Sequence, residues 1–346
     1  MDTVKTKSPL LSVVIPTYNK SSYLIEMLRT IKVQTYRSWE LFIIDDGSDK
    51  TEYEKVMAFV SDDARIKLMK RNREPKNGDT CRNIGMELAK GKYIMIFDAD
   101  DLVSKTCFEN RVRFMENHPE FDYVSFPSAS FIEGTKDIKK RDYNTSDNDI
   151  LGNLLLTKYP FTVWANIYRK SSLENIRWDE KVYLYQDFDF MVQCILKGLK
   201  HGWADSKEPD YFYRVFVKGE SVCSNVVTEQ KTISTNYLFE KIVNQLSEYK
   251  DVARYVALFL TFVVLYYERL LRDNNSVYIE KFLTVIDRIY PEESKRFRDV
   301  YKKRLRSKNL HYSLYLMYNK LYSYYKIPMH RSYAIHEIAK TLLLRK

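Results

Sequence analysis

The chain has 346 residues, of which 45% are hydrophobic and 29% charged, so it has enough apolar residues for a large core or two domains and is not a disordered protein. Its formal net charge is +10, but thirteen Lys and Arg residues against two acidic ones lie between Arg296 and Lys346, so the rest of the chain is close to neutral. No nucleic-acid-binding motif accompanies this charge, and we therefore expect no nucleic-acid partner.

The cysteines and the apolar runs indicate the compartment. Four cysteines are widely spaced and form no C-x-x-C pair, which is typical of reduced core thiols and not of disulfides or zinc ligands: Cys81, Cys107, Cys194 and Cys223. The apolar run from Leu10 to Ile15 is too short for a signal peptide. The longest uncharged apolar run, Tyr255 to Tyr267, has 13 residues, fewer than the roughly 20 that cross a bilayer. We therefore expect a cytoplasmic protein.

Strand and helix patterns alternate through the first hundred residues. Leu11 to Ile15 and Trp39 to Ile44 are predicted strands, and each is followed by a helical pattern. A short strand over Ile66 to Met69 precedes a helix for which Asp79 is the predicted N-cap and which runs to Ala89. Alternation about every 20 residues predicts an α/β fold with a mainly parallel sheet flanked by helices.

The next strand, Tyr93 to Phe97, consists of five apolar residues and is predicted to be buried on both faces. Acids follow two of the predicted strands: Asp45 and Asp46 after one, and Asp98, Asp100 and Asp101 after the other. Both clusters should face the edge at which open α/β sheets bind ligands. Asp-x-Asp offers hard oxygen ligands to a divalent cation that can hold a diphosphate. The alternative is that these acids solvate a strand end and cap the next helix.

Known motifs exclude one cofactor class and indicate a family. None of the nine glycines is spaced as G-x-G-x-x-G, so a dinucleotide-binding turn is not expected. Five motifs follow one another over about ninety residues: Ser12 to Asn19 (SVVIPTYN), Asp45 to Ser48 (DDGS), Arg82-Asn83-x-Gly85, Gly91-x-Tyr93, and Asp98 to Asp101 (DADD). This series resembles family 2 of the nucleotide-sugar glycosyltransferases, of the bacterial surface-polysaccharide type, which have the GT-A fold. A second block resembles the acceptor half of that family: Trp164 to Arg169, Ile176 to Glu180, and Gln186 to Phe190.

The resemblance covers roughly residues 10 to 220 and implies the domain organisation. We expect a Rossmann-like GT-A domain over residues 1–225, with a nucleotide-sugar half at about 10–101 and an acceptor half at about 102–225. Helical periodicity predicts a smaller, basic α-helical domain over 226–346. Its last part interleaves basic and aromatic residues, which favours peripheral contact with the anionic inner face of a membrane. A helical packing domain with a solvated basic face explains the same pattern.

The resemblance also implies which residues bind the nucleotide. The matching residues are Pro16, Thr17, Tyr18, Asp46 and Arg82. By this resemblance, Tyr18 would stack on the base and Asp46 would accept a hydrogen bond from the base N–H, while Pro16 and Thr17 would shape the loop. The expected donor is therefore a UDP-sugar. Arg82 would lie near the nucleotide and neutralise phosphate. The alternatives are a buried tyrosine, an Asp that caps the next helix, and a surface arginine paired with Glu87.

A metal site is predicted at the acids that follow the strand from Tyr93 to Phe97. By resemblance, Asp100 should bind Mg²⁺ or Mn²⁺, with Asp98 near the ribose or the metal. Such a cation lowers the barrier to transfer because the departing nucleoside diphosphate gains negative charge. We expect Asp101 to face away from this site and to cap a helix.

The general base of the family falls on Asp187, which would take the proton of the acceptor hydroxyl. Asp187 is equally suited to cap the helix from Phe188 to Leu196, and the two roles are compatible. Asp189, two residues further on, is the second candidate for the base. The sequence departs from the family at Gln186, where a Glu is usual, so the neighbouring contact to acceptor or sugar is expected to differ. In the loop after Tyr213, where some relatives carry a metal-binding His, this chain has Phe216 and Val217.

These features predict an inverting, metal-dependent transfer of one hexosyl or N-acetylhexosaminyl group from a UDP-sugar to a hydroxyl of a glycan or lipid-linked glycan. The Q-x-x-R-W motif of processive synthases is absent. One alternative is a non-catalytic protein of the same fold that binds a nucleotide sugar or a glycan, which the departure at Gln186 motivates. A nucleotidyltransferase is a second alternative, but it normally needs a Gly-rich basic loop after the first strand.

Overall fold

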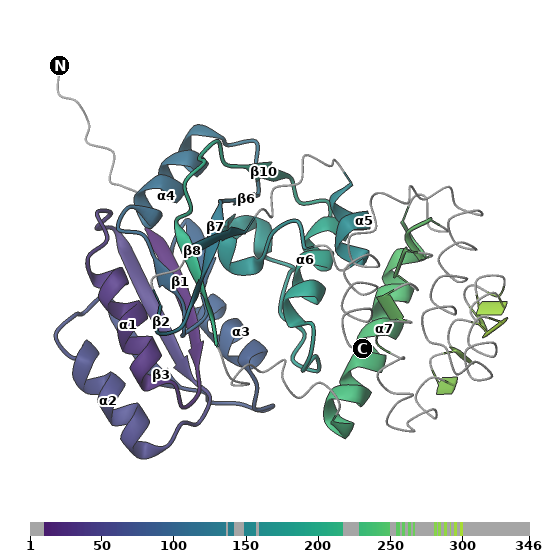
Figure 1. Ribbon diagram of the computed structural model, residues 1–346, viewed down its shortest axis with the longest axis horizontal. Coiled ribbons are helices and arrows are strands. Elements are labelled where there is room, and N and C mark those ends of the chain that lie inside the picture. The colour runs from purple at the N-terminus through teal and green to yellow at the C-terminus, as the bar shows by residue number, and fades with distance from the viewer. Residues whose placement is uncertain are drawn as a thin grey trace. The chain divides into compact units, whose positions relative to one another are not determined.

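The computed structural model describes residues 10–135, 138–141, 149–156, 159–216 and 228–249, together with scattered helical residues between 254 and 299 (Figure 1). The chain divides into two compact units. The first comprises Met1–Ser146 and Phe161–Ser224, and the second comprises Asp147–Pro160 and Asn225–Lys346. The segment 147–160 therefore belongs to the second unit, although no sequence pattern assigned it there. The basic stretch that follows residue 299 lies outside the described residues.

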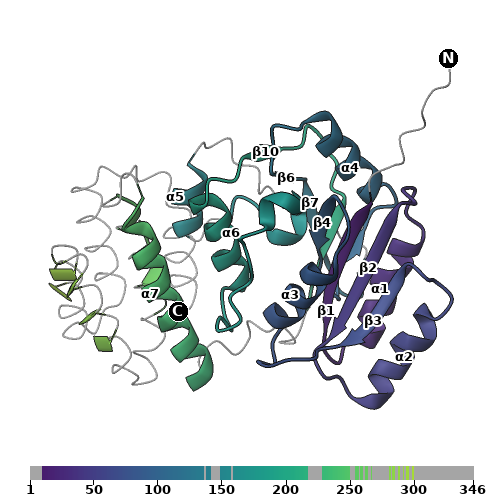
Figure 2. The same cartoon turned by 180° about the vertical axis from the view of Figure 1, so that it is seen from behind.

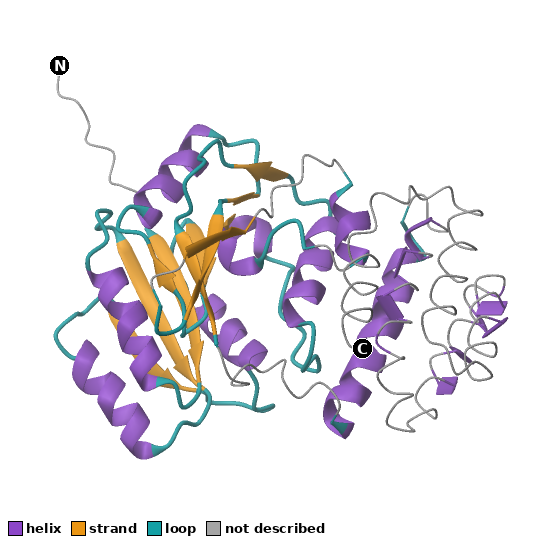
Figure 3. Ribbon diagram, viewed as in Figure 1, coloured by secondary structure: helices purple, strands orange, loops and turns teal. Residues whose placement is uncertain are grey.

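A seven-stranded sheet forms the centre of the first unit, and its strands are among those drawn in orange in Figure 3. The strand order is β10-β6-β9-β4-β1-β2-β3. Its strands are β1 (Leu11–Thr17), β2 (Trp39–Asp45), β3 (Ile66–Lys70), β4 (Tyr93–Ile96), β6 (Tyr123–Ser125), β9 (Asn166–Arg169) and β10 (His201–Trp203). β1 pairs in parallel with β2 and β4, and β2 pairs in parallel with β3. β9 runs antiparallel to both of its neighbours, β4 and β6. The mainly parallel sheet that the alternating pattern predicts is thus confirmed.

Helices cover both faces of this sheet, as Figures 1 and 2 show. α1 (Ser21–Lys32), α2 (Lys50–Val60) and α4 (Cys107–Asn117) lie on one face, and α3 (Gly78–Leu88) lies on the other. Side chains alternate along β1, so Val13 joins the core cluster beneath α1, α2 and α4 while Val14 faces α3. All four residues of β4 are buried, as expected for a strand covered on both faces.

Gly85 allows α3 to lie close to the sheet. A Cβ atom at this position would come within 2.3 Å of Val14 Cγ1, so any larger residue would push the helix away from β1. The glycine of the Arg82-Asn83-x-Gly85 motif therefore fixes the distance between helix and sheet. That distance in turn sets where Arg82, one turn earlier on α3, meets the edge of the sheet.

A second, four-stranded sheet has the order β5-β11-β7-β8. It is formed by β5 (Leu102–Val103), β7 (Ser128–Ile132), β8 (Ile138–Arg141) and β11 (Tyr211–Val215). β11 pairs antiparallel with β5 and parallel with β7. Because β5 follows directly after Asp101, this pairing brings β11 next to the acids at the end of β4.

The helix predicted to start at Asp79 has a different N-cap. The Asn77 side chain accepts a hydrogen bond from Thr80 N (2.7 Å), and Asp79 lies in the first turn of α3 with none of its surface exposed. The prediction that Asp79 is the cap is therefore wrong. Asparagine is as good an N-cap as aspartate, and Asn77 leaves the Asp79 carboxylate to point into the protein.

The second unit is helical where it is described. Asp149 caps α5 (Ile150–Leu155) by accepting from Gly152 N (2.9 Å), and Arg254 forms an ion pair with the same carboxylate. α7 (Glu229–Leu246) buries Phe239. The Phe239 ring lies edge-on to three aromatic rings with centroids 5.5 Å away, those of Phe259, Phe262 and Tyr266.

Within the part of the chain that the structure describes, none of the helices has the length and apolar character that crossing a bilayer requires. Cys81, Cys107 and Cys194 are free and buried, as expected for core thiols, and Cys223 lies outside the described residues.

Candidate active site

The two acidic clusters lie at one edge of the large sheet. β1, β2 and β4 are parallel neighbours, so the residues that follow them meet at their carboxyl ends. Asp46 follows β2, Asp98 follows β4, and Tyr18 follows β1. Asp46 N donates to Thr17 O (2.8 Å), which joins the ends of β1 and β2. The prediction that both clusters face the same edge is confirmed.

The two acids after β2 have different tasks. Asp45 Oδ2 accepts from Gly47 N (3.1 Å) and Ser48 N (3.0 Å), and it thereby builds the turn in which Gly47 has a φ of 90°. The Asp46 carboxylate instead accepts from Arg71 Nε at 2.7 Å. The N-cap of α2 is Asp49, so the alternative in which Asp46 caps this helix is wrong.

Tyr18 and Asp46 share one basic neighbour, Lys76, and Asp46 has a second one in Arg71. Tyr18 is 47% exposed, which excludes the buried-tyrosine alternative, and Lys76 Nζ lies 4.0 Å from the centre of its ring. Burial raises the pKa of Asp46, and the neighbouring Arg71 and Lys76 oppose this rise. Pro16 and Thr17 are the last two residues of β1, where Pro16 is half-buried and Thr17 is buried. Sequence reasoning did not single out Arg71 or Lys76, because no motif marks the loop after β3.

Asp98 and Asp100 present hard oxygen donors at the end of β4. Burial raises the pKa of Asp98, the Arg82 guanidinium lowers it, and the charge of Asp100 raises it again. Asp100 forms an ion pair with the Lys20 ammonium group, which no motif predicted. Two carboxylates that repel each other beside a chain ammonium group form a donor set that suits a hard divalent cation.

The described residues contain no group of three or more His, Cys, Asp or Glu side chains placed to hold a metal ion. A cation at Asp98 and Asp100 would therefore take its remaining ligands from water and substrate. This is the usual mode for Mg²⁺, which proteins often bind through one or two carboxylates together with the phosphates of a substrate.

Asp101 is not a helix cap, and that prediction is wrong. Its side chain is fully buried and accepts from Tyr211 OH (2.7 Å) and from Arg214 N (2.7 Å), both in β11. Arg214 Nε also donates to the carbonyl oxygen of Asp100 (2.6 Å). The next helix, α4, begins at Cys107 after Thr106. Asp101 thus fastens the acidic turn to the second sheet, a tertiary contact that sequence spacing does not reveal.

Arg82 is buried, so the alternative of a surface arginine paired with Glu87 is wrong. Its guanidinium donates to Asp79 Oδ1 (2.9 Å) and to Asp98 Oδ1 (3.2 Å). It also lies 4.5 Å from the centre of the Trp178 ring. The arginine that pairs with Glu87 is Arg73, at 2.9 Å for each of two contacts.

Asp187 lies in the first turn of α6 (Gln186–Leu196), where the helix N-terminus favours a carboxylate. Tyr185, which precedes the helix, has a φ of 63°, a conformation that costs free energy in a residue other than glycine. Burial raises the pKa of Asp187 to about 6, with Arg82 opposing the rise and Asp98 adding to it. Asp189, the second candidate, is 1% exposed and accepts from Gln193 Nε2 (2.8 Å), so an acceptor hydroxyl has less access to it.

Gln186 has a fixed orientation beside this acid. Its Nε2 donates to Val182 O (3.1 Å), and its Oε1 lies 3.5 Å from Arg82 Nη1. The amide group thus links α6 to the guanidinium on α3. The departure from the family at this position therefore changes the charge beside Arg82 but keeps a polar contact with it.

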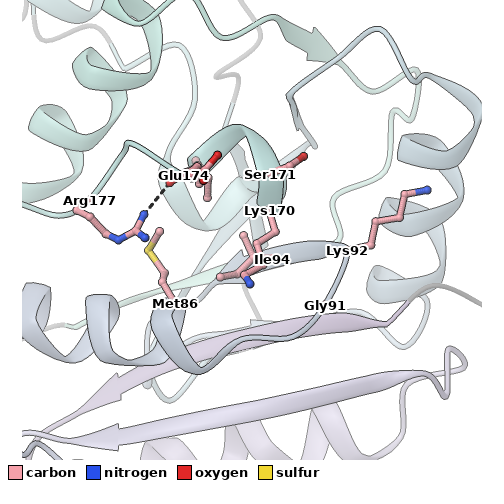
Figure 4. A pocket seen from close by; sticks show the side chains of 9 residues that line it. Met86, Gly91, Lys92, Ile94, Lys170, Ser171, Glu174 and Arg177 are labelled. Carbon is pink, nitrogen blue, oxygen red and sulfur yellow. Dashed lines mark hydrogen bonds between the residues drawn. The ribbon is translucent and has the colours of Figure 1, made fainter.

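A separate pocket of about 500 Å³ lies elsewhere in the first unit (Figure 4). Its lining comes from α3, from the amino end of β4, from η2 (Lys170–Leu173) and from the residues that follow η2. The lining residues include Met86, Gly91, Ile94, Lys170, Glu174 and Arg177. The acids follow the carboxyl end of β4, so this pocket takes no part in the candidate site.

Comparison with known proteins supports the reading of the motifs. The family model for glycosyl transferase family 2 matches residues 12–177. An uncharacterized glycosyltransferase of Methanocaldococcus jannaschii, MJ1057, is 32% identical over 203 residues, which cover 56% of this chain and 67% of that protein. The minor teichoic acid biosynthesis protein GgaB of Bacillus subtilis is 27% identical over 292 residues, which cover 80% of this chain but only 31% of GgaB.

Solved structures show the same architecture. The crystal structure of S. aureus TarS 1–349 in complex with UDP-GlcNAc matches with a TM-score of 0.64 and 15% identity, and the match covers 85% of this chain and 91% of that one. At this level of identity the likeness shows the fold, which is GT-A. The chain belongs to glycosyltransferase family 2.

Proposed function

We propose that this protein transfers a single hexosyl or N-acetylhexosaminyl group from a UDP-sugar, with inversion and with Mn²⁺ or Mg²⁺, to a hydroxyl of a glycan or lipid-linked glycan. One observation carries the proposal: the acids that follow β2 and β4 lie at one sheet edge, and the buried Arg82 guanidinium at this edge interacts with both Asp98 and Asp187. Asp46 lies at the base side, Asp98 and Asp100 lie at the end of β4, and Asp187 has a pKa raised to about 6. This is the set that activation of a donor and of an acceptor requires.

The surroundings of Asp46 support uridine as the base. Uracil presents a carbonyl oxygen on each side of its N3–H group, so it needs an acceptor flanked by donors. Asp46 supplies the acceptor, and Arg71 and Lys76 are the two cations that act on its carboxylate. Cytosine would turn an unprotonated ring nitrogen toward the same carboxylate, which is repulsive. The UDP-GlcNAc complex of TarS, which shares the fold, is consistent with this choice.

Asp98 and Asp100 would hold the divalent cation through their carboxylate oxygens. When bound, such a cation neutralises negative charge on the diphosphate as it leaves. Arg82 adds a fixed positive charge on the Asp98 side of the site. The Arg82 guanidinium is held by two helices and needs no rearrangement, so its contribution to the transition state is preorganised.

Asp187 would act as the general base. It would accept the proton of the acceptor hydroxyl as that oxygen attacks the anomeric carbon, while the bond to the UDP oxygen breaks on the opposite face. A single base and a direct displacement give inversion of configuration. A pKa of about 6 leaves Asp187 ionised at neutral pH and still basic enough to take the proton.

The acceptor part of the proposal rests on the relatives and on the basic end of the chain. GgaB, which is similar over most of this chain, is described as a minor teichoic acid biosynthesis protein. Residues 296–346 combine their positive charge with many tyrosines, a composition suited to the anionic inner face of a membrane. We therefore propose a polymeric or lipid-linked glycan acceptor and a place of action at that face.

A UDP-release assay tests this function. It uses a panel of UDP-sugars together with glycan and lipid-linked acceptors and Mn²⁺. We expect release by the wild type and a loss of roughly a hundredfold or more in Asp187→Asn. Asp189→Asn is the matched control, because it makes the same change two residues away in the same helix, and it should retain most of the activity. Undiminished transfer by Asp187→Asn would show that the base is another residue. UDP binding with no transfer from any sugar would favour the sugar-nucleotide-binding alternative.

A further inference from the structure

One buried carboxylate near the candidate site has no part in the mechanism proposed above. Asp79 has none of its surface exposed, and its Oδ2 atom has no hydrogen-bond partner among the described residues. Burial raises its pKa well above the ordinary value, Arg82 opposes this, and the charges of Asp187 and Asp189 add to it. Keeping such a group in the core costs free energy, so a compensating role is expected.

The contacts of Asp79 indicate that role. Its Oδ1 accepts from Arg82 Nη1 at 2.9 Å, while Nη2 of the same guanidinium donates to Asp98 at 3.2 Å. A Cβ atom on Gly78 would lie 3.1 Å from Arg82 Nη1, so the helix leaves space for the guanidinium. The stacking of the guanidinium on Trp178, at 4.5 Å, restricts its tilt. Arg82 is therefore held in one orientation from several sides.

Gln186 completes this arrangement from the acceptor half of the site. Its amide oxygen lies 3.5 Å from Arg82 Nη1, and its amide nitrogen donates to Val182 O. A carboxylate at this position would face the Val182 carbonyl oxygen and would place another negative charge beside Asp187. The neutral Gln186 avoids both costs because Asp79 already supplies a carboxylate to Arg82 from the other helix.

We propose that Asp79 and Gln186 are a pair of positioning residues that hold the Arg82 guanidinium at Asp98, with the carboxylate coming from α3 and the neutral group from α6. In this arrangement the Arg82 guanidinium interacts both with Asp98 at the edge of the sheet and with α6, the helix that contains Asp187. The inference rests on the proposed function, because the diphosphate of the donor is the group that Arg82 is positioned to meet.

A double-mutant cycle tests the pairing. Asp79→Asn removes the charge at nearly constant volume, and Gln186→Glu adds a carboxylate on the opposite side of the guanidinium. Each single change should lower kcat and weaken UDP binding by roughly tenfold. In the double variant the carboxylate and the amide exchange sides and the net charge of the wild type is restored. We therefore expect the kcat and the UDP affinity of the double variant to be within about tenfold of the wild-type values. Independent effects would instead lower each quantity roughly a hundredfold.

Glu87→Gln provides the control cycle. It also removes a carboxylate from α3 that pairs with an arginine, but that arginine is Arg73, so its effect should simply multiply with that of Gln186→Glu. Melting temperatures of all variants show whether the compared proteins are folded. If Asp79→Asn does not fold, Asp79→Ser takes its place in the cycle.

The two readouts separate this inference from the proposed function. If effects of Asp79→Asn and Gln186→Glu multiply in both kcat and UDP affinity, the pairing is wrong even though the enzyme is a transferase. If the wild type releases no UDP from any donor, the proposed function fails, and the cycle on UDP affinity still decides the pairing. The pairing is supported if the effects of Asp79→Asn and Gln186→Glu on UDP affinity are coupled while those of Glu87→Gln and Gln186→Glu are not.

Discussion

The Lys20 ammonium group donates a hydrogen bond to the carboxylate of Asp100, the residue that we propose as a metal ligand. Lys20 also lies 5.3 Å from the centre of the Phe216 ring, so it contacts both an anion and an aromatic face. The chain thus supplies a cation of its own to Asp100. A divalent ion must displace this ammonium group, which makes metal affinity dependent on a residue outside the acidic motif.

Replacing Lys20 by Met should tighten the binding of Mn²⁺ in the absence of nucleotide. The competing ammonium group is then missing, and a partly buried ion pair of this kind corresponds to a gain of roughly three- to tenfold. Titration calorimetry with Mn²⁺ alone measures this affinity. Lys50→Met, which removes an exposed lysine paired with Glu54, is the control and should have no effect. Unchanged or weaker Mn²⁺ binding in Lys20→Met would show that the pair does not compete with metal.

The pH dependence of transfer should report Asp187. Its pKa is raised to about 6 by burial, and the base works only when it is deprotonated. We therefore expect kcat/KM to fall as the pH is lowered through about 6, and the residual activity of Asp187→Asn to lack this acid limb. A pH–rate profile of both proteins from pH 5 to 8 provides the measurement. The same limb in the variant would assign it to another group.

The raised pKa of Asp187 also affects folding stability, but in the opposite direction to activity: a low pH favours stability and a high pH favours activity. Asp187 binds its proton more tightly in the folded than in the unfolded state, so its contribution to stability is lost as the pH rises from about 4 through about 6. At pH 7.5, Asp187→Asn should therefore be more stable than the wild type by about 1–2 kcal/mol. This difference should disappear below about pH 4. Denaturant unfolding at the two pH values is the test, and a less stable variant at pH 7.5 would contradict it.

Gly85→Ala should destabilise the first unit. The new methyl group would lie 2.3 Å from Val14 Cγ1, and overpacking of this kind costs about 1–3 kcal/mol. The change would also move α3 and with it Arg82, so transfer should fall. Val14→Ala makes room for the methyl group, and the double variant should lose less than the sum of the two single losses. Strict additivity in thermal or denaturant unfolding would mean that this contact does not set the position of the helix.

Much of the fold and part of the site follow from the sequence because they depend on local patterns. Continuous apolar runs predict β1, β2 and β4, and their parallel pairing places Asp46 and Asp98 at one edge. β6, β9 and β10 have only three or four residues each and, unlike β4, contain polar residues or glycine that interrupt the apolar run, so no pattern marks them as strands. The antiparallel insertion of β9 between β4 and β6 was accordingly not predicted.

The contacts that sequence reasoning missed are tertiary ones. Lys20 on Asp100, Arg71 on Asp46 and β11 on Asp101 each join residues that are at least 25 positions apart. Asp79 was misassigned because an aspartate at the start of a helix usually caps it, and here Asn77 takes that place. Spacing within a motif thus identifies the acids, but it does not tell which partner neutralises each of them.

The central claim is that uridine diphosphate and a divalent cation bind together at the edge formed by Asp46, Asp98 and Asp100. Titration calorimetry of UDP into the wild type and Asp100→Asn, each with and without Mn²⁺, tests it most directly. We predict that Mn²⁺ strengthens UDP binding to the wild type by roughly tenfold or more, about 1.4 kcal/mol, and has little effect on Asp100→Asn. UDP affinity that is the same with and without Mn²⁺, or an equal gain in both proteins, would contradict the account.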